Sequence, residues 1–274
     1  MKNILVPCDF SDPAEEAFRF AIDIARQSEG EVHVLHVIDI TFLQGNPSLS
    51  YSYAFNLSFL KEIEKDAEDK FNAMRNRHAA KTVAVKFKHI IGSLISEIES
   101  YIKTNGINLV VMGTQGTGHA KYGSNTAKVV RHVQVPVITI HTAPEAAIRN
   151  IVYPVIPEQK DDALVSQVKE LQKFFHARLN LLWVNTPFIL KPDPDAQREL
   201  QVFAQEFGLY NYTINIRSDY TIEDGVEHFS REIDADMIAM GTHAWKGILH
   251  LVVGSITEDV VNHQHVPVWT CFMK

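Results

Sequence analysis

The sequence predicts an α/β protein built from two tandem open sheets, each with about five parallel strands. Three features predict this fold class: the length of the chain, an internal repeat, and an alternation of strand-like and helix-like patterns. A chain of 274 residues is long enough for about two domains. Its 46% apolar and 22% charged residues are typical of a globular protein and exclude a disordered one.

Four matched segments occur in the same order in both halves of the chain. The longest match pairs residues 129–139 with residues 260–270, and seven of these eleven pairs are identical. The shorter matches are Ile4–Pro7 with Ile151–Pro154, Val111–Thr114 with Ala239–Thr242, and Gly123–Ser124 with Gly254–Ser255. Four ordered matches indicate a tandem duplication. We therefore expect two domains, at residues 1–146 and 147–274, with extra residues in the first around positions 40–80.

Short runs rich in valine and isoleucine predict the strands of the first repeat. The first and fourth runs are apolar throughout, as expected for parallel strands that are covered on both faces. The predicted strands are Ile4–Cys8, Val32–Ile38, Val83–Lys88, Leu109–Met112 and Val135–Ile140.

The segment between the first two of these strands predicts a helix. Asp12 is a good N-cap, Pro13 suits the first helical position, and Gly30 can end the helix. Apolar residues recur along the segment at spacings of three and four, at Ala14, Ala17, Phe18, Ala21, Ile22 and Ala25.

The second repeat shows the same alternation of patterns. Its predicted strands are 151–155, 179–184, 211–217, 236–240 and 267–271, and its predicted helices are 161–176, 195–207, 221–233 and 255–263. Such an alternation implies βαβ units and a parallel sheet. Ligands of open parallel sheets bind at the carboxyl ends of the strands, near the point where the strand order reverses.

The loops after the first and fourth strands are therefore the candidate site, at residues 8–12 and 113–124 and at 155–160 and 241–254. Both fourth-strand loops contain glycines and end on a Gly-Ser pair. Glycine lets the backbone approach a ligand, and a Gly-Ser pair that opens a helix can offer donors to a phosphate. The loops match neither the P-loop nor the dinucleotide fingerprint. The glycines either bind phosphate or only form turns and caps.

These motifs resemble those of the universal stress protein family. The nucleotide-binding members of that family carry Gly-x2-Gly-x9-Gly-(Ser/Thr) after the fourth strand and an aspartate at the end of the first. Residues 4–11 resemble the opening of the family, and the resemblance covers nearly the whole chain, once per repeat. It implies Rossmann-like sheets of the adenine-nucleotide alpha-hydrolase type. It also implies that strands 135–140 and 267–271 pack the two repeats into an intrachain pseudo-dimer; a homodimer of chains stays open.

The resemblance implies a nucleotide site in the first repeat. Asp9 would meet the adenosine, Val37 would present its backbone to the adenine, and the Gly123–Ser124 region would take the phosphates. The implied cofactor-binding residues are Pro7, Asp9, Val37, Met112, Gly113, Gly116, Gly123, Ser124 and Asn125. The first repeat departs from the family pattern, because six residues instead of nine separate Gly116 from Gly123.

The second repeat departs from the pattern at other positions. Ala244 replaces a glycine and Ile156 stands where the aspartate is expected, although the nine-residue spacing is kept. Its implied site residues, ranked second, are Met240, Gly241, Gly254, Ser255 and Ile256. The first repeat has a net charge of -1 (15 basic and 16 acidic residues) and the second of -6 (11 and 17). Because a polyphosphate prefers the less acidic half, we favour the first repeat.

The sequence patterns and the resemblance to the family leave three functions open. The first is a stress-response regulator that binds ATP or a related adenine nucleotide, with a divalent ion such as Mg²⁺ on its phosphates. The second is an interaction module that binds no nucleotide and keeps remnant glycine loops. The third and weakest is a slow ATPase, because residues 9–12 lack the Ser-Gly-Gly-x-Asp-Ser loop of related ATP-cleaving enzymes and no G-x-S-x-G motif occurs.

Other features argue against further classes of function. The net charge of -7 argues against nucleic acid or anionic membranes as partners. No apolar run could span a membrane, and the N-terminus lacks the apolar core of a signal peptide, so we expect a cytoplasmic protein. Cys8 and Cys271 cannot form a disulfide scaffold, and the histidines have no ligand spacing typical of a metal site. An aromatic insert at 41–59 could cover the pocket, contact an unknown protein partner or pack in the core.

Overall fold

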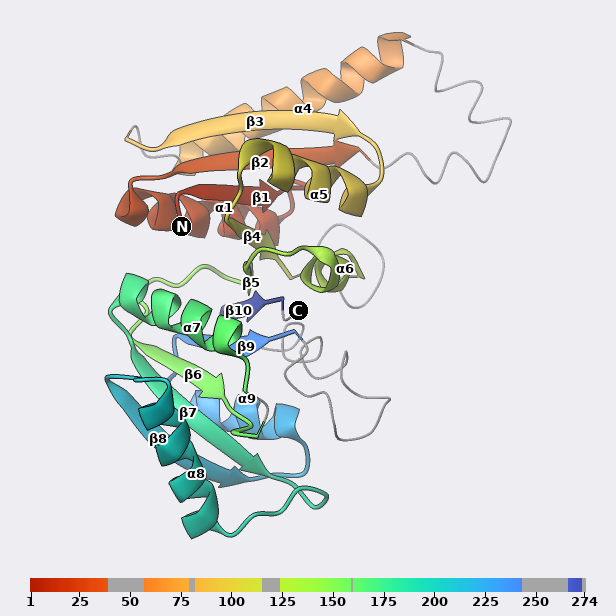
Figure 1. Ribbon diagram of the computed structural model, residues 1–274. Helices are drawn as coiled ribbons and strands as arrows, with labels where there is room; N and C mark the ends of the chain where they lie inside the picture. Colours follow the sequence, from red (N-terminus) through yellow and green to blue (C-terminus); the bar gives the residue numbers. More distant parts are fainter. Residues whose placement is uncertain (39–56, 79–81, 115–123, 159, 243–265, 273–274) are drawn as a thin grey trace. The chain divides into compact units, whose positions relative to one another are not determined.

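The chain forms two compact units, Met1–Ala143 (unit 1) and Pro144–Lys274 (unit 2). The computed structural model describes residues 1–38, 57–78, 82–114, 124–158, 160–242 and 266–272 (Figure 1). The aromatic insert at 41–59 lies outside these residues up to position 56, and the fourth-strand loops lie outside them from 115 to 123 and from 243 to 265.

Unit 1 contains a five-stranded parallel sheet, as the sequence predicts. The strand order is β3-β2-β1-β4-β5, and each neighbouring pair is parallel. The strands are β1 (Asn3–Pro7), β2 (Glu31–Ile38), β3 (Ala84–Ile91), β4 (Leu109–Gly113) and β5 (Val137–Ile140). The strand predicted at 135–140 begins only at Val137, because Pro136 lacks the N–H that a strand residue donates.

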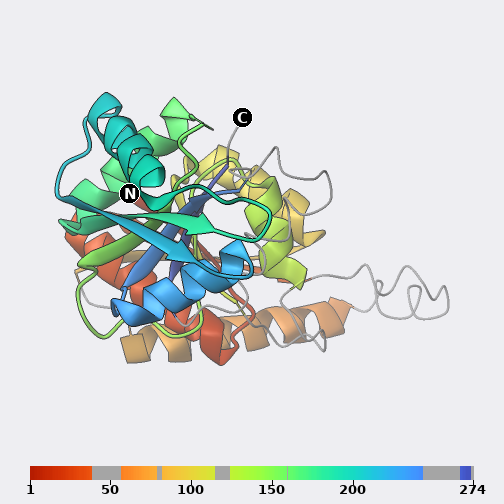
Figure 2. The same ribbon diagram turned by 90° about the horizontal axis from the view of Figure 1, so that it is seen from below.

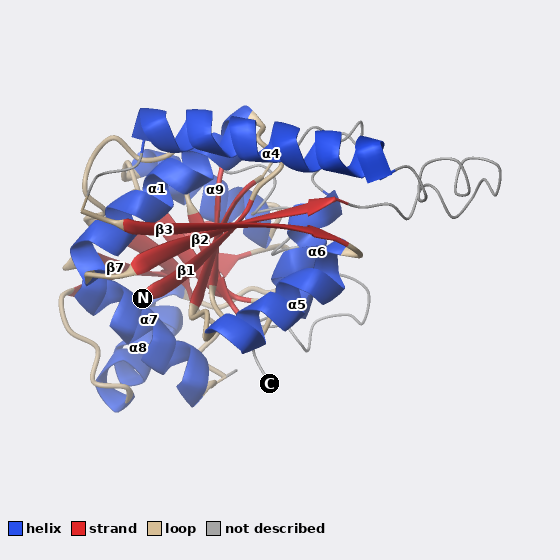
Figure 3. Cartoon of the chain, turned by 90° about the horizontal axis from the view of Figure 1, so that it is seen from above, coloured by secondary structure: helices blue, strands red, loops and turns tan. Residues whose placement is uncertain are grey.

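The helices in the described part of unit 1 cover the two faces of this sheet. Figure 3 shows α1 and α4 on one side of strands β1 to β3 and α5 and α6 on the other. The helices are α1 (Asp12–Ser28), α4 (Leu57–His78), α5 (Leu94–Asn105) and α6 (Ser124–His132). The side of α5 and α6 holds a buried cluster that includes Leu5, Leu35 and Val110 from the strands.

The ends of α1 differ from the sequence prediction by one residue. Ser11, and not Asp12, is the N-cap, since its Oγ accepts a hydrogen bond from the Ala14 N–H at 3.4 Å, and Pro13 is the second helical residue. The left-handed residue at the C-terminus is Glu29, with φ of 51°. Gly30 is needed for a different reason, because a Cβ there would lie 2.3 Å from the Lys2 carbonyl oxygen.

Unit 2 repeats the topology of unit 1 with the strand order β10-β9-β6-β7-β8, all neighbouring pairs being parallel. The strands are β6 (Asn150–Pro154), β7 (Arg178–Asn185), β8 (Tyr212–Ser218), β9 (Met237–Gly241) and β10 (Val268–Cys271). The helices are α7 (Asp162–Phe175), α8 (Asp193–Glu206) and α9 (Ile222–Glu232). Figure 2 shows α7 and α8 on one face of β7 and β8 and α9 on the other.

The predicted elements of unit 2 are confirmed within about two residues at each end, except for the helix predicted at 255–263, which lies outside the described residues. The packing of the two repeats through strands 135–140 and 267–271 stays a prediction. Across the described ranges, every helix is too short or too polar to cross a membrane.

Candidate functional site

The strand order reverses next to the first strand of each unit. In unit 1 the chain passes from β1 to β2 and β3 on one side and then crosses to β4 on the other side of β1. The loops that follow β1 and β4 therefore leave the sheet side by side at its carboxyl edge, where open parallel sheets bind ligands. This edge carries the described part of the predicted site.

Asp9 lies two residues after the end of β1 and is exposed at this edge. Its Oδ1 accepts hydrogen bonds from the Ser11 N–H at 3.1 Å and the Ser11 hydroxyl at 2.6 Å. Since Ser11 also caps α1, the carboxylate is held at the first turn of the helix. Asp9 is thus fixed in place and faces solvent, as a ligand-binding carboxylate needs to be.

Phe10 explains how the loop turns at this point. It has φ of 61°, a left-handed conformation that costs an aromatic residue about 1–2 kcal/mol. Its ring packs against the rings of His36, at 4.9 Å between centroids, and Phe87, at 6.3 Å. His36 is itself held by a hydrogen bond between its Nδ1 and the Cys8 carbonyl oxygen at 2.7 Å. No pattern in the sequence signals this strained residue.

Gly113 ends β4 and has a packing role that does not depend on a ligand. A Cβ at this position would lie 2.6 Å from the backbone carbon of Pro13, so only glycine lets the first turn of α1 approach β4. Thr126 of α6 donates its hydroxyl hydrogen to the Gly113 carbonyl oxygen at 2.9 Å. Met112, just before it, is buried. The β1 loop, β4 and α6 are therefore joined at one edge.

The predicted residues of the first repeat differ in their exposure. Asp9 and Asn125 are exposed, whereas Pro7 and Met112 are buried in their strands. Val37 is half-buried near the end of β2 and packs on the apolar cluster beneath α5. Ser124 is the first residue of α6, and Gly116 and Gly123 lie outside the described residues.

The equivalent edge of unit 2 has different chemistry. Ile156, at the position of Asp9, packs against the buried cluster beneath α9 and offers no carboxylate. Met240 and Gly241 are buried at the end of β9. Gly254, Ser255 and Ile256 lie outside the described residues.

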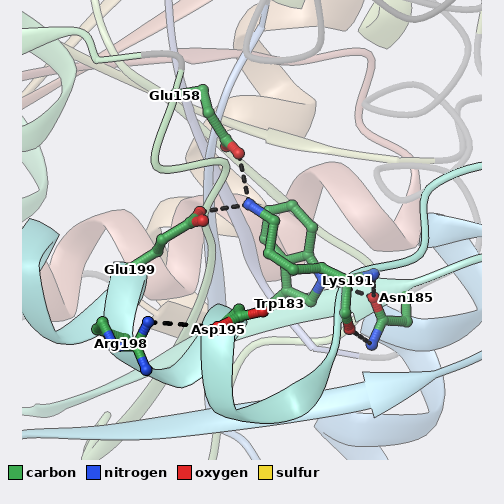
Figure 4. A network of polar contacts seen from close by, with 7 residues as sticks. All are labelled: Glu158, Trp183, Asn185, Lys191, Asp195, Arg198 and Glu199. Atoms are coloured by element: carbon green, nitrogen blue, oxygen red, sulfur yellow. Dashed lines mark hydrogen bonds and ion pairs between the residues drawn. The ribbon is translucent and has the colours of Figure 1, made fainter.

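A polar network that sequence reasoning missed lies at the end of β7 (Figure 4). The Lys191 Nζ lies 4.5 Å from the centroid of the Trp183 ring and makes ion pairs with Glu158, at 2.5 Å, and with Glu199. Asn185 Oδ1 accepts hydrogen bonds from Trp183 Nε1 at 2.9 Å and from the Lys191 N–H at 2.8 Å. We call these five residues the Lys191 latch.

The charges in the latch stabilise one another. Burial alone would lower the pKa of Lys191, but its hydrogen bonds to Glu158 and Glu199 outweigh this effect and raise it. Burial alone would raise the pKa of Glu158, but the hydrogen bond from Lys191, together with a backbone hydrogen bond and the Lys191 charge, lowers it. The latch joins Glu158, the segment from Trp183 to Lys191, and Glu199 of α8, and no regular residue spacing signals it.

Two further features limit the chemistry of the described residues. Burial raises the pKa of the Cys8 thiol to about 12, so this thiol is not a nucleophile at neutral pH. Within the described ranges, no group of three His, Cys, Asp or Glu side chains could hold a metal ion.

Comparisons with known proteins match both halves of the chain. The model of the Universal stress protein family matches residues 1–141 and 147–271. A universal stress protein of Methanocaldococcus jannaschii is 30% identical over 142 residues, which cover 51% of this chain and 81% of that protein. One from Synechocystis is 24% identical and aligned over 98% of this chain and 99% of its own length.

The crystal structure of a universal stress protein from Archaeoglobus fulgidus has the same fold. It superposes with a TM-score of 0.75 and 20% sequence identity, over 98% of this chain and 96% of that one. At this level of identity the likeness concerns the fold alone.

Proposed function

The chain belongs to the universal stress protein family, and on that premise we propose that unit 1 binds ATP or a related adenine nucleotide and acts in stress regulation. The observation that carries this proposal is Asp9, an exposed and fixed carboxylate at the point where the strand order of unit 1 reverses. A carboxylate there can accept hydrogen bonds from the hydroxyl groups of a ribose.

The start of α6 supports the phosphate half of the proposed site. This helix begins at Ser124 beside the end of β4, to which the Thr126 hydroxyl joins it. The free N–H groups of a helix N-terminus favour a phosphate, and a Mg²⁺ ion bound to that phosphate would come with the nucleotide. Asp9 and the α6 N-terminus thus supply chemically suitable groups for the two ends of a nucleotide.

Unit 2 supports nucleotide binding less well. Ile156 packs on the buried cluster beneath α9, so this unit lacks the carboxylate that would hold a ribose. Its half of the sequence also carries the larger negative charge, with 11 basic and 17 acidic residues. Both features favour unit 1 for an anionic ligand.

An interaction module without nucleotide is the second candidate, and Gly113 is the observation that favours it. The close approach of α1 to β4 explains this glycine without any ligand. A glycine loop that serves only packing would be retained even after nucleotide binding was lost.

Calorimetry with Mg-ATP distinguishes the two candidates. We expect wild-type protein to bind, and Asp9→Ala to weaken binding at least tenfold because the ribose loses its acceptor. Asp23→Ala, which removes an exposed carboxylate on the surface of α1, is the matched control and should bind as the wild type does. Absence of wild-type binding at about 1 mM ATP, a free energy weaker than about -4 kcal/mol, would leave the interaction module.

A further inference from the structure

The most exposed large apolar side chains of the described residues lie on two neighbouring loops of unit 2. Phe188 and Leu190, between β7 and α8, are 89% and 79% exposed, and Tyr220, between β8 and α9, is 83% exposed. The two loops follow adjacent strands (Figure 1), and the Asp219 N–H donates to the Asn185 carbonyl oxygen at 2.9 Å where they begin. All three side chains therefore belong to one edge of the unit.

The loop that carries Phe188 and Leu190 is held in shape by its own hydrogen bonds. The Asn185 side chain accepts from the Lys191 N–H at 2.8 Å and donates to the Lys191 carbonyl oxygen at 2.9 Å, so it joins the two ends of the loop. Between them, Thr186 and Ile189 exchange two backbone hydrogen bonds, at 2.9 and 3.1 Å. The Lys191 ammonium anchors the same loop to Trp183, Glu158 and Glu199 (Figure 4).

Because the loop is held by these hydrogen bonds, the exposure of its apolar side chains calls for an explanation. Single apolar residues on a protein surface are common and need no explanation. A flexible loop would be able to turn its phenylalanine and leucine towards the protein, whereas a clamped loop keeps them in water. A clamped loop also loses little conformational freedom when a partner covers it, and such preorganisation strengthens binding.

The residues around the loop give the surface a negative rim. Glu158 and Asp195 are exposed, as is Asp193 at the start of α8, and the exposed Arg198 pairs with Asp195. The Lys191 side chain is only 19% exposed and already paired with two carboxylates.

The neighbouring loop adds to the same negative charge. Residues 218–224 contain the half-buried Glu223 and Asp224 and no lysine or arginine, whereas Asp219 in the same segment is only 10% exposed. The nearby Arg217 and His228 side chains are paired with Asp219. The rim therefore favours a basic partner and disfavours both a second copy of the same surface and an anionic membrane.

We propose that Phe188, Leu190 and Tyr220 form a docking surface for a protein that presents an apolar face flanked by lysine and arginine. The two loop residues are the anchors, the Lys191 latch holds them in position, and the acidic rim orients the basic partner. All residues of this surface belong to unit 2, whereas Asp9 belongs to unit 1.

A labelled helical peptide with leucines on one face and lysines on the other is the probe, and fluorescence anisotropy with the full chain measures its binding. We expect the double variant Phe188→Ser/Leu190→Ser to bind at least tenfold more weakly than wild type. Val202→Ser is the matched control, since Val202 is also exposed, at 53%, but lies on α8. The control should stay within twofold of wild type, and a peptide with glutamates in place of lysines should not bind.

A latch variant tests the role of the clamp. Lys191→Met keeps the length and apolar character of the side chain but removes the ammonium. We expect it to bind the peptide several-fold more weakly while the apolar anchors are intact. Unchanged affinity would remove the latch from the proposal.

Other results would overturn the docking surface itself. Equal binding by the double variant would show that only overall acidity attracts the peptide, and no wild-type binding at 1 mM would also contradict the proposal. If sedimentation showed that the wild type is a dimer and the double variant a monomer, the surface would be assigned to a second copy of the chain. Flotation with anionic vesicles that depends on Phe188 and Leu190 would assign it to a membrane.

Discussion

Units 1 and 2 share one strand framework but differ at its carboxyl edge. The Cys8 N–H donates to the Leu35 carbonyl oxygen at 2.9 Å, and at the equivalent place the Val155 N–H donates to Leu182 at 3.0 Å. After this point unit 1 exposes a carboxylate, whereas unit 2 has the half-buried Ile156 and forms the Lys191 latch. Strand register depends on the buried core, so a duplicated fold keeps its strands while its edge residues change.

Two glycine variants test how far the packing of the two units is equivalent. Gly113→Ala places a Cβ against the fixed backbone of Pro13, and overpacking of this kind costs about 3 kcal/mol at the upper end of its range. Gly225→Ala places a Cβ 2.4 Å from a methyl group of Val184, but alanine gains about 1 kcal/mol of helix propensity over glycine in α9. We therefore expect the unit 1 variant to lose more stability in urea unfolding.

The positions of the tryptophans allow the two units to be followed separately. All three, Trp183, Trp245 and Trp269, lie in the second half of the chain, so their fluorescence reports unit 2 and circular dichroism reports both units. We assume that Gly113 faces rigid backbone of α1 and that Gly225 of α9 faces an adaptable valine side chain. A larger loss of stability for Gly225→Ala than for Gly113→Ala would contradict this assumption.

The framework was predictable from the sequence because buried parallel strands are continuous apolar runs. Strand β1 was predicted at 4–8 and lies at 3–7, and the parallel pairing follows from the alternation of strands and helices. The residues at the carboxyl edge of the sheet were less predictable. Ser11 and Asp12 are both good caps, so the sequence alone could not place the start of α1 to the residue.

Two parts of the edge depend on contacts that a local pattern does not contain. Phe10 adopts its left-handed conformation because its ring packs against His36 and Phe87, which are brought near by the fold. The Lys191 latch needs Glu158, which precedes α7, beside Glu199 of α8. The resemblance to a family predicted Asp9 as a site residue, and the structure shows it exposed at the edge where a ligand would bind.

Loss of the latch should destabilise unit 2 more than loss of an ordinary surface ion pair. Lys191→Met leaves Glu158 and Glu199 close together without a cation and should cost about 2 kcal/mol. Lys160→Met is the control, because its ion pair with Glu206 is about half exposed and such pairs contribute about 0–1 kcal/mol. Urea unfolding followed by tryptophan fluorescence measures both. Equal losses would mean that the latch is no more than a surface contact.

Acid should weaken both units through different carboxylates. Hydrogen bonds from Arg77 and His78 lower the pKa of Glu15 in unit 1, and they outweigh the effect of burial. Burial alone would raise the pKa of Asp219 in unit 2, but hydrogen bonds from His228 and Arg217 outweigh it and lower the pKa. Because the unfolded chain binds protons first, the stability from each group is complete above its ordinary pKa of about 4 and is lost as the pH falls below it.

A pair of amide variants separates these two contributions. Between pH 6 and pH 3 each unit is expected to lose part of its free energy of unfolding. Glu15→Gln should reduce this loss in unit 1 by about 1 kcal/mol, and Asp219→Asn should reduce it in unit 2 by a similar amount. The urea midpoint measured from pH 6 to pH 3 checks this, with fluorescence assigned to unit 2. If Asp219→Asn left the fluorescence midpoint as pH-dependent as in wild type, Asp219 would not be a source of the acid sensitivity.

The smallest effect is expected for the N-cap residues of α1 and α9. Ser11 caps α1 and also contacts the proposed nucleotide site, whereas Thr221 only caps α9. Ser11→Ala removes a long cap bond of 3.4 Å on α1 and should cost about 0.5 kcal/mol, at the low end for N-caps. Thr221→Ala removes the bond that the Asp224 N–H makes to Thr221 Oγ1 on α9 at 3.0 Å, at a similar cost. Only Ser11 also binds Asp9, so Ser11→Ala should weaken Mg-ATP binding about two- to fivefold in calorimetry while Thr221→Ala leaves it unchanged. Equal ATP affinity in the two variants would show that Asp9 does not depend on its neighbour, and the contrast between the edges of the two units would then rest on the carboxylate alone.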